Sequence, residues 1–316
     1  MRHFFTITSL LVLLGCGSFS SRQSTNPSAT VSTAALSEID FWQDYAIVHA
    51  DYGTKTTVSI KGNKRIMQTN ALPNHATGKF PNAGNPNRIS AQNVTYNFPL
   101  EPKLSGVSRW AREPGVALNG VKFEPETAER FVCESGEVYR IEAFQELVDL
   151  GLDFNHAHVQ PTGAYHYHGV PVELVKALDK GEDLVHVGFA LDGFPIYYSQ
   201  SGKYKPSFRL SEALRTGDAC SYRNPKQSMS KELAGTNPDG TFVSDWDYVA
   251  GLGDLDECNG REIEGQYAYF VTDEYPYMSR CLKGEFKEER RPGPPPGHNG
   301  PPPSGHRQRG GHPHHH

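Results

Sequence analysis

Two His-x-His pairs constrain this chain more than any other feature. They lie in residues 154–169, which read F-N-H-A-H-V-Q-P-T-G-A-Y-H-Y-H-G. Residues two apart on a β-strand point to the same face, so each pair presents two imidazoles to one side. Between the pairs, Pro161 suits the first position of a turn, and Gly163 suits the left-handed position that closes a three-residue loop. The segment is therefore predicted to form a β-hairpin.

The register of this hairpin decides whether the imidazoles meet. With residues 161–163 as the loop, His158 lies opposite His166. His156 then lies opposite His168, so all four imidazoles share one face and the intervening tyrosines occupy the other. Neutral imidazole is the commonest metal ligand in proteins. The hairpin therefore predicts a transition-metal site, and a polar network of histidines without an ion is the alternative.

Copper and zinc are the metals that this ligand set favours, because it offers imidazole nitrogen and no thiolate. His186, on a strand predicted after the hairpin, is the candidate for a fifth ligand. Asp192 is the candidate to orient an imidazole through its non-ligating nitrogen. The alternatives are a core histidine at 186 and a turn residue at 192. His75 is expected to be an exposed loop histidine.

A second cluster of metal-ligating residue types supplies oxygen atoms. Asp254, Asp256 and Asn259 lie close together beside Gly260. Calcium would suit such oxygens, but their spacing does not match an EF-hand loop. A loop that hydrogen-bonds to itself is the favoured interpretation.

Several motifs in and around the hairpin are similar to those of one protein family. G-A-Y-H-Y-H-G resembles the signature of the YHYH-domain family. The resemblance extends to N-H-A-H-V-Q-P-T-G before it, G-F-A-L-D-G-F-P-I-Y after it, and G-D-L-D-E-C-N-G-R and Y-A-Y-F-V-T-D further on. The chain departs from the pattern at Tyr198, where the family has glycine, and by an insertion between Arg209 and Asn237. The resemblance implies a YHYH domain of an exported bacterial protein, which we place at residues 39–285.

The N-terminus is typical of an export signal. Residues 1–15 contain a basic start and the apolar run Phe4–Leu14, which is too short to span a membrane as a mature helix. The run ends in L-L-G-C, which resembles a bacterial lipobox with Cys16 as the lipidated residue, a position that can carry palmitate. Gly17 after this cysteine resembles lipoproteins that are sorted to an outer membrane. A flexible tether is expected at residues 16–38. We therefore expect a lipoprotein of the cell envelope, with a plain signal peptide as the alternative.

The C-terminal segment has a different composition. Residues 286–316 contain mostly Pro, Gly, Arg and His and almost no apolar residues. Such a segment cannot bury enough surface to offset its chain entropy, so it is expected to be disordered. Its histidines suggest loose metal capture. The formal net charge of the chain is -5 and no basic stripe is present, so we expect metal ions and the membrane as partners, and no nucleic acid.

The four cysteines after Cys16 predict two disulfides. An even number of cysteines in an exported chain favours pairing, with three connectivities to choose from. We favour Cys258–Cys281, because these residues flank a predicted strand, and this choice leaves Cys133–Cys220. No Cys-x-x-Cys pair is present, which disfavours a thiolate zinc site.

The segment pattern predicts a mainly β fold, with antiparallel sheets packed as a sandwich or barrel-like structure and one or two short helices. The clearest helix follows Pro171 and ends at Gly181, and a second is predicted at residues 143–150. Strands or hairpins are predicted at residues 55–60, 93–99, 116–123, 128–141, 184–197 and 267–273.

Three classes of function remain, and the favoured one is an envelope lipoprotein that captures or buffers copper or zinc. A metal-dependent enzyme with an open coordination position is the first alternative, and a structural or adhesion module without metal is the second. A carboxylate near the open position would favour the enzyme, for which Asp192, Asp256 and Glu257 are the candidates. Serine catalysis is not supported, because the chain has no G-x-S-x-G motif.

Overall fold

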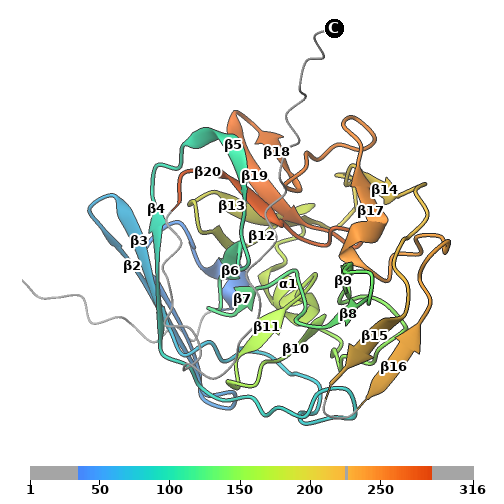
Figure 1. The fold of residues 1–316 in the computed structure, drawn as a ribbon. Coiled ribbons are helices and arrows are strands. Elements are labelled where there is room, and N and C mark those ends of the chain that lie inside the picture. Colours follow the sequence, from blue (N-terminus) through green and yellow to red (C-terminus); the bar gives the residue numbers. More distant parts are fainter. Residues whose placement is uncertain (1–34, 225–226, 287–316) are drawn as a thin grey trace, which may run out of the picture.

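The computed structural model describes residues 35–224 and 227–286. The predicted signal peptide, most of the tether and almost all of the predicted tail lie outside these residues. The described chain is mainly β, which confirms the predicted fold class (Figure 1). Within it, no helix has both the length and the apolar character needed to cross a membrane.

The largest sheet has eight strands and carries the histidine hairpin at one edge (Figure 1). Its strands, in order across the sheet, are β10 (Ala157–Val159), β11 (Tyr165–Tyr167), β7 (Lys122–Phe123), β6 (Gly115–Ala117), β12 (Leu184–Ala190), β13 (Pro195–Ser199), β19 (Gln266–Val271) and β18 (Gly260–Ile263). The pairs β11–β7 and β13–β19 are parallel, and the other pairs are antiparallel. The sheet is therefore mixed, and it stays open instead of closing into a barrel.

A second sheet packs on the first through the main hydrophobic core. It is antiparallel and consists of β1 (Tyr45–His49), β2 (Thr54–Lys61), β3 (Lys64–Thr69) and β4 (Val94–Pro99). Alternate residues of β4 point inward, and the ring of Phe98 lies 5.9 Å from that of Phe189 on β12. Burying a side chain of this size stabilises the fold by about 1.5–3 kcal/mol. The two sheets thus form the sandwich that the alternation predicted.

A third sheet has its own hydrophobic cluster. It contains β16 (Ser228–Lys231), β15 (Cys220–Arg223), β8 (Arg130–Val132) and β9 (Val138–Arg140). Phe131, Tyr222 and Phe242 are buried in this cluster, next to the disulfide Cys133–Cys220. Two smaller sheets pair β14 (Phe208–Leu210) with β17 (Trp246–Tyr248), and β20 (Cys281–Gly284) with β5 (Leu104–Trp110).

Both predicted disulfides are present. Cys133 follows β8 and joins the first residue of β15, and Cys258 joins the first residue of β20. The cysteine pairing chosen from the sequence is therefore confirmed.

One of the two predicted helices forms. Helix α1 (Val172–Leu178) buries its apolar side, as its sequence indicates. Residues 143–150 are not helical, so that prediction is wrong. The side chain of Gln145 accepts hydrogen bonds from the backbone N–H groups of Leu147 and Val148, which gives the backbone an alternative to helical bonds. Two short 3-10 helices, η1 (Leu36–Glu38) and η2 (Val243–Asp245), complete the described elements.

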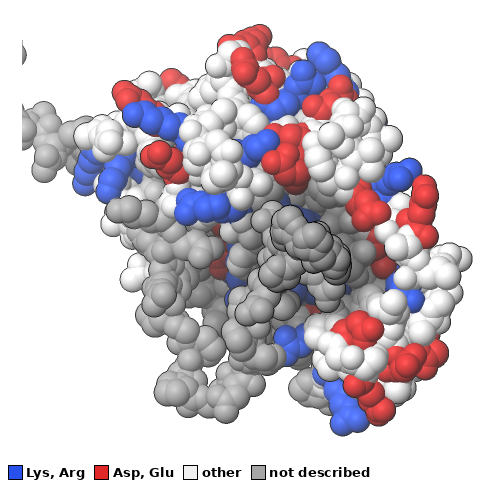
Figure 2. Space-filling model, turned by 45° about the horizontal axis from the view of Figure 1, so that its top comes forward, with Lys and Arg blue, Asp and Glu red and all other residues white. Residues whose placement is uncertain are grey.

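Charged side chains of both signs are mixed over the face drawn in Figure 2, where acidic and basic groups alternate among uncharged residues. No broad area of a single sign is visible among the described residues of this face. Histidine side chains instead gather in a largely buried cluster.

Candidate metal centre

The histidine hairpin has the register that the sequence predicts. His158 on β10 pairs with His166 on β11, and the backbone N–H of Gly163 donates to the carbonyl of Gln160 to close the turn. Gly163 has a φ of 85°, and a Cβ at this position would clash with the hydroxyl of Ser90. The glycine is thus required both for the turn and for the segment that packs over it.

Three of the four histidines converge. Nε2 of His168 lies 3.1 Å from Nε2 of His158 and 3.0 Å from Nε2 of His166. One ligand atom from each of the three residues lies within 4.8 Å of the others. His166 and His168 are buried and His158 is partly buried, so the cluster lies at the hairpin edge of the large sheet, largely shielded from solvent.

His156 is not brought to this cluster. Its carbonyl accepts a hydrogen bond from the N–H of His168, as the predicted register requires. However, its φ is 56°, a left-handed conformation in which the side chain leaves the common face of the strand. Nδ1 of His156 instead donates to the carbonyl of Val170 at 2.9 Å, and its ring meets the ring of Phe144 edge-on. The predicted face of four imidazoles is therefore reduced to three.

The hydrogen bonds of the outer ring nitrogens fix the protonation of the inner ones. Nδ1 of His158 lies 2.9 Å from the carbonyl of Leu150, and Nδ1 of His166 lies 3.2 Å from the carbonyl of Ala164. A carbonyl only accepts, so both Nδ1 atoms carry the proton, and in the neutral ring both Nε2 atoms are then unprotonated.

Nε2 of His168 faces both of these lone pairs. Its ring can donate one proton from Nε2, which satisfies one neighbour and leaves the lone pair of the other neighbour without a donor. A cation between the three nitrogens removes this conflict.

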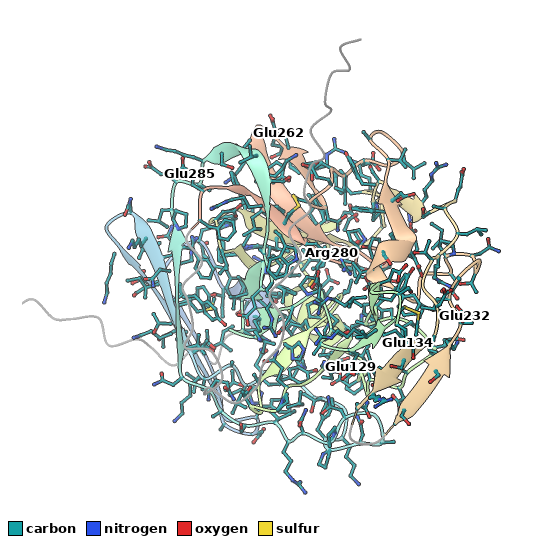
Figure 3. The ribbon with its side chains drawn as sticks, viewed as in Figure 1. Glu129, Glu134, Glu232, Glu262, Arg280 and Glu285 are labelled. Carbon is teal, nitrogen blue, oxygen red and sulfur yellow. A yellow bond between two sulfur atoms is a disulfide. The ribbon has the colours of Figure 1, made fainter. Side chains whose placement is uncertain are left out.

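The electrostatics of the cluster favour neutral rings, which is the form that binds metal. Burial lowers the pKa of His158, and burial lowers those of His166 and His168 well below the usual value. Neighbouring imidazoles lower the pKa values of His166 and His168 further. Arg280, near the centre of the view in Figure 3, also lowers the pKa of His168.

The spacing of the nitrogens fits a transition metal. A tetrahedral zinc ion with Zn–N bonds of about 2.0–2.1 Å separates its nitrogen ligands by about 3.3 Å. The observed separations of 3.0 and 3.1 Å need to open by only a few tenths of an ångström. Three protein ligands also leave a fourth coordination position for a water or another molecule.

The tyrosines of the hairpin lie on the opposite face and are held by buried partners. Tyr165 donates its hydroxyl to Asp153 at 2.7 Å. The hydroxyl of Tyr167 lies 2.6 Å from Nε2 of His75 and accepts a bond from the side chain of Asn119. His75 is therefore buried, and its prediction as an exposed loop residue is wrong. These bonds fix the rear of the strand that carries two of the three converging histidines.

An ion-pair network borders the cluster on its other side. Lys122 on β7 is in register with His166, and Glu124 continues beyond this strand on the same face. Glu124 accepts bonds from Arg112, Lys122 and Gln160 at 2.6–3.0 Å. Glu124 could not be singled out from the sequence, because only the parallel pairing of β7 with β11 places it here.

The remaining candidates for the histidine site lie elsewhere. His186 stacks on Trp42 at 4.8 Å and bonds to the carbonyl of Gly188, so it is a core histidine. Asp192 accepts bonds from the hydroxyl of Tyr269 and the N–H of Gly284. Burial raises the pKa of Asp192 to about 6. Neither residue belongs to the converging group, and both fit their alternative interpretations, a core histidine at 186 and a turn residue at 192.

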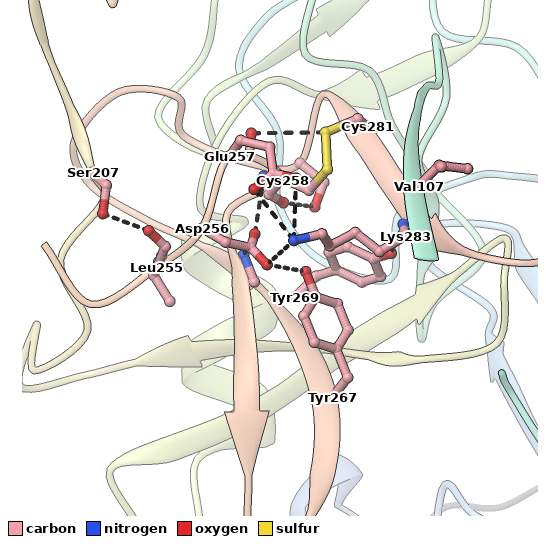
Figure 4. A network of polar contacts seen from close by, with 12 residues as sticks. Val107, Ser207, Leu255, Asp256, Glu257, Cys258, Tyr267, Tyr269, Cys281 and Lys283 are labelled. Atoms are coloured by element: carbon pink, nitrogen blue, oxygen red, sulfur yellow. Dashed lines mark hydrogen bonds and ion pairs between the residues drawn. A yellow bond between two sulfur atoms is a disulfide. The ribbon is translucent and has the colours of Figure 1, made fainter. Parts of the chain in front are cut away.

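The oxygen-rich loop hydrogen-bonds to its own surroundings (Figure 4). Asp256 accepts bonds from the N–H groups of Cys258 and Gly260, from the hydroxyl of Tyr267 and from Lys283. The other two members of the predicted calcium loop are also engaged, since Asp254 accepts from the N–H of Lys205 and Asn259 donates to the carbonyl of Phe270. Both carboxylates are thus used within the fold, as the favoured interpretation of this loop expected.

Fold and site together describe a mainly β protein with a buried cluster of three histidines on an edge hairpin. Comparison with protein families matches residues 95–284 to the family described as YHYH protein. The chain therefore belongs to the YHYH family, as its motifs predicted. No curated protein and no solved structure matches it.

Proposed function

We propose that His158, His166 and His168 bind one transition-metal ion through their Nε2 atoms and leave its fourth coordination position open. The observation that carries this proposal is the pair of Nε2–Nε2 contacts at 3.0 and 3.1 Å. The tautomers fixed by Leu150 and Ala164 leave the lone pair of at least one of these Nε2 atoms without a donor in the absence of a cation.

We further propose that the protein captures or buffers copper or zinc in the cell envelope. Both metals suit a set of imidazole ligands, and copper is bound more tightly than zinc by a given set of ligands. The acids considered as catalytic partners, Asp192, Asp256 and Glu257, bond to other parts of the fold. Glu124, the acid that borders the cluster, is engaged by Arg112, Lys122 and Gln160, so these acids support the holding of a metal over hydrolysis. A metal-dependent enzyme is the second candidate, favoured by the count of three protein ligands.

The metal content of the purified protein tests the first proposal. The experiment uses a full-length variant in which the tail histidines are replaced by glutamine, because they would bind metal independently; these are His298, His306, His312, His314, His315 and His316. We expect one copper or zinc ion per chain by mass spectrometry and equilibrium dialysis. A tail-substituted protein that binds neither metal would contradict the proposal.

The same variant has an expected pH dependence. Free histidine titrates near pH 6.5, and burial lowers the pKa values of the three site histidines. They therefore stay neutral below this value, and affinity should remain high at pH 6.5 and fall only at more acid pH, as protons compete with the metal. Loss of half the bound metal above pH 6.5 would show that the site is more exposed than the structure indicates.

Attachment to the membrane through Cys16 is a separate proposal, supported by the L-L-G-C sequence at the end of the apolar run. A Cys16→Ser variant is expected to move from the membrane fraction to the soluble fraction while its domain stays folded. Fractionation of producing cells, with circular dichroism of the released protein, measures both effects. If the serine variant stays with the membranes as the unchanged protein does, Cys16 is not the anchor.

A further inference from the structure

A second group of functional side chains lies beside the histidine cluster. Arg280, directly before β20, pairs with Glu142 through Nη2 and Oε2 at 2.8 Å, and its guanidinium carbon lies 4.7 Å from the centre of the Tyr275 ring. The side chain of Glu142 is 1% exposed and that of Arg280 is 12% exposed. Phe144, two residues after Glu142, lies against Gly169, which directly follows His168.

This group contains buried polar atoms without hydrogen-bond partners. They are Nε and Nη1 of Arg280 and Oε1 of Glu142. Leaving one such group unsatisfied costs about 1–3 kcal/mol, and more for charged groups. Several unsatisfied atoms in one place indicate a missing binding partner.

The geometry of the ion pair differs from that of a purely structural one. Arginine and carboxylate often pair through two parallel bonds, which satisfy both carboxylate oxygens. Here one bond forms, and two guanidinium nitrogens and one carboxylate oxygen remain free to bind something else. The arrangement therefore offers donors from Arg280 and an acceptor from Glu142 in one buried place.

We propose that Arg280 and Glu142 form a subsite for a small planar oxyanion, a carboxylate or bicarbonate, that occupies the open position of the metal. The proposal rests on the metal site proposed above. Free N–H groups of Arg280 donate to oxygen atoms of the anion. Oε1 of Glu142 accepts from a hydroxyl group of the same molecule, so hydroxy acids and bicarbonate fit better than a simple carboxylate. Another oxygen of the anion binds the metal.

The chemistry of the pair supports this class of ligand. The guanidinium is planar, always charged and matched to two oxygens of a planar anion. The negative charge of Glu142 offsets that of Arg280, so the subsite favours an anion that also carries a hydrogen-bond donor. An anion without a donor leaves Oε1 unsatisfied, and a site built to bond a hydroxyl discriminates against ligands that lack it.

Cobalt(II) in the histidine site provides the probe, because its visible absorption changes with the number and type of its ligands. The tail-substituted full-length protein is loaded with cobalt(II) and titrated with acetate, glycolate and bicarbonate. We expect saturable spectral changes, with glycolate or bicarbonate binding at least about tenfold more tightly than acetate, in keeping with the missing hydrogen bond. Separate titrations distinguish a carboxylate from bicarbonate as the preferred ligand.

Two variants distinguish anion binding at the subsite from a general effect of positive charge near the metal. Arg280→Met alone would leave Glu142 as an unpaired buried charge and destabilise the fold. The double variant Arg280→Met/Glu142→Gln removes both charges together and avoids this effect. It should bind cobalt(II) as before and bind each anion at least about tenfold more weakly. Arg112→Met is the matched control, because Arg112 also lowers the pKa of a site histidine but is 63% exposed. It should change anion binding by less than about threefold.

The outcomes separate this inference from the metal proposal. If the protein binds cobalt(II) but no anion changes its spectrum, or if both arginine variants weaken anion binding equally, the subsite is wrong and the metal site stands. If the protein binds no metal, both proposals fail together. If the double variant loses the metal itself while remaining folded by circular dichroism, Arg280 and Glu142 support the histidines instead of an anion, and the subsite is again wrong.

Discussion

Replacing His168 with alanine is expected to reduce metal affinity more than any other single change outside the tail. Its Nε2 contacts the Nε2 atoms of both other site histidines, so its loss leaves two ligands that no longer enclose an ion. Loss of a residue that only hydrogen-bonds to a metal ligand typically lowers metal affinity by about 10- to 100-fold. We therefore expect a loss of more than about 100-fold. Competition with a chromogenic chelator, in the tail-substituted protein, measures it.

Two matched variants from the same hairpin serve as controls. His156→Ala removes an imidazole that points to Val170 and not to the cluster, so metal affinity should stay within a few-fold of the original. Tyr167→Phe removes a hydroxyl from the opposite face. It should cost about 1–3 kcal/mol of stability, because His75 loses its partner, without removing the metal. Equal loss of metal in His156→Ala and His168→Ala would mean that the chain uses all four histidines, contrary to the structure.

The hairpin could be predicted because its information is local. The two-residue spacing of the histidines and the turn residues between them determine the register, and the structure has that register. The departure at His156 has a cause outside the hairpin pattern. A left-handed φ at this residue accompanies its bond to Val170 and its contact with Phe144. The alternating spacing of a strand does not indicate such a left-handed residue. His156 was therefore expected to join the other three histidines, and it does not.

The groups around the three histidines could not be predicted from the sequence, because they come from distant parts of the chain. Glu142 and Arg280 are 138 residues apart, and His75 and Tyr167 are 92 residues apart. Glu124 reaches the site through a parallel pairing of β7 with β11, which short-range patterns do not encode. The sequence therefore indicated the three histidines that converge, together with His156, which does not, but it did not indicate the residues that surround them.

The disulfides were predictable for a different reason. With four cysteines, placing one pair around a strand determines the other by elimination, even though Cys133 and Cys220 lie 87 residues apart. The helix predicted at residues 143–150, in contrast, does not form. Its apolar spacing is real, since Val148 and Leu150 are buried. The side chain of Gln145 nevertheless bonds to the backbone of this segment, and the apolar residues are buried without a helix.

Removing the Cys133–Cys220 disulfide is expected to destabilise the fold more than removing Cys258–Cys281. A cross-link stabilises mainly by restricting the unfolded chain, and the effect grows with the length of the loop that it closes. Separations of 87 and 23 residues correspond to about 4.6 and about 3.4 kcal/mol in this treatment. The Cys133→Ala/Cys220→Ala variant should therefore have the lower free energy of unfolding, measured by urea denaturation and compared with Cys258→Ala/Cys281→Ala.

The structure gives a second reason to expect a greater loss of stability without Cys133–Cys220. Strands β8 and β15 pair at a single position, Val132 with Ser221, and the adjacent disulfide adds a covalent connection between the two halves of the third sheet. The hydrophobic cluster around it is separate from the core that carries the histidine hairpin. The Cys133→Ala/Cys220→Ala variant should thus bind metal normally at temperatures where it is folded. Loss of metal by the folded variant, or a greater loss of stability without Cys258–Cys281, would show that the third sheet is coupled to the site more tightly than its separate core indicates.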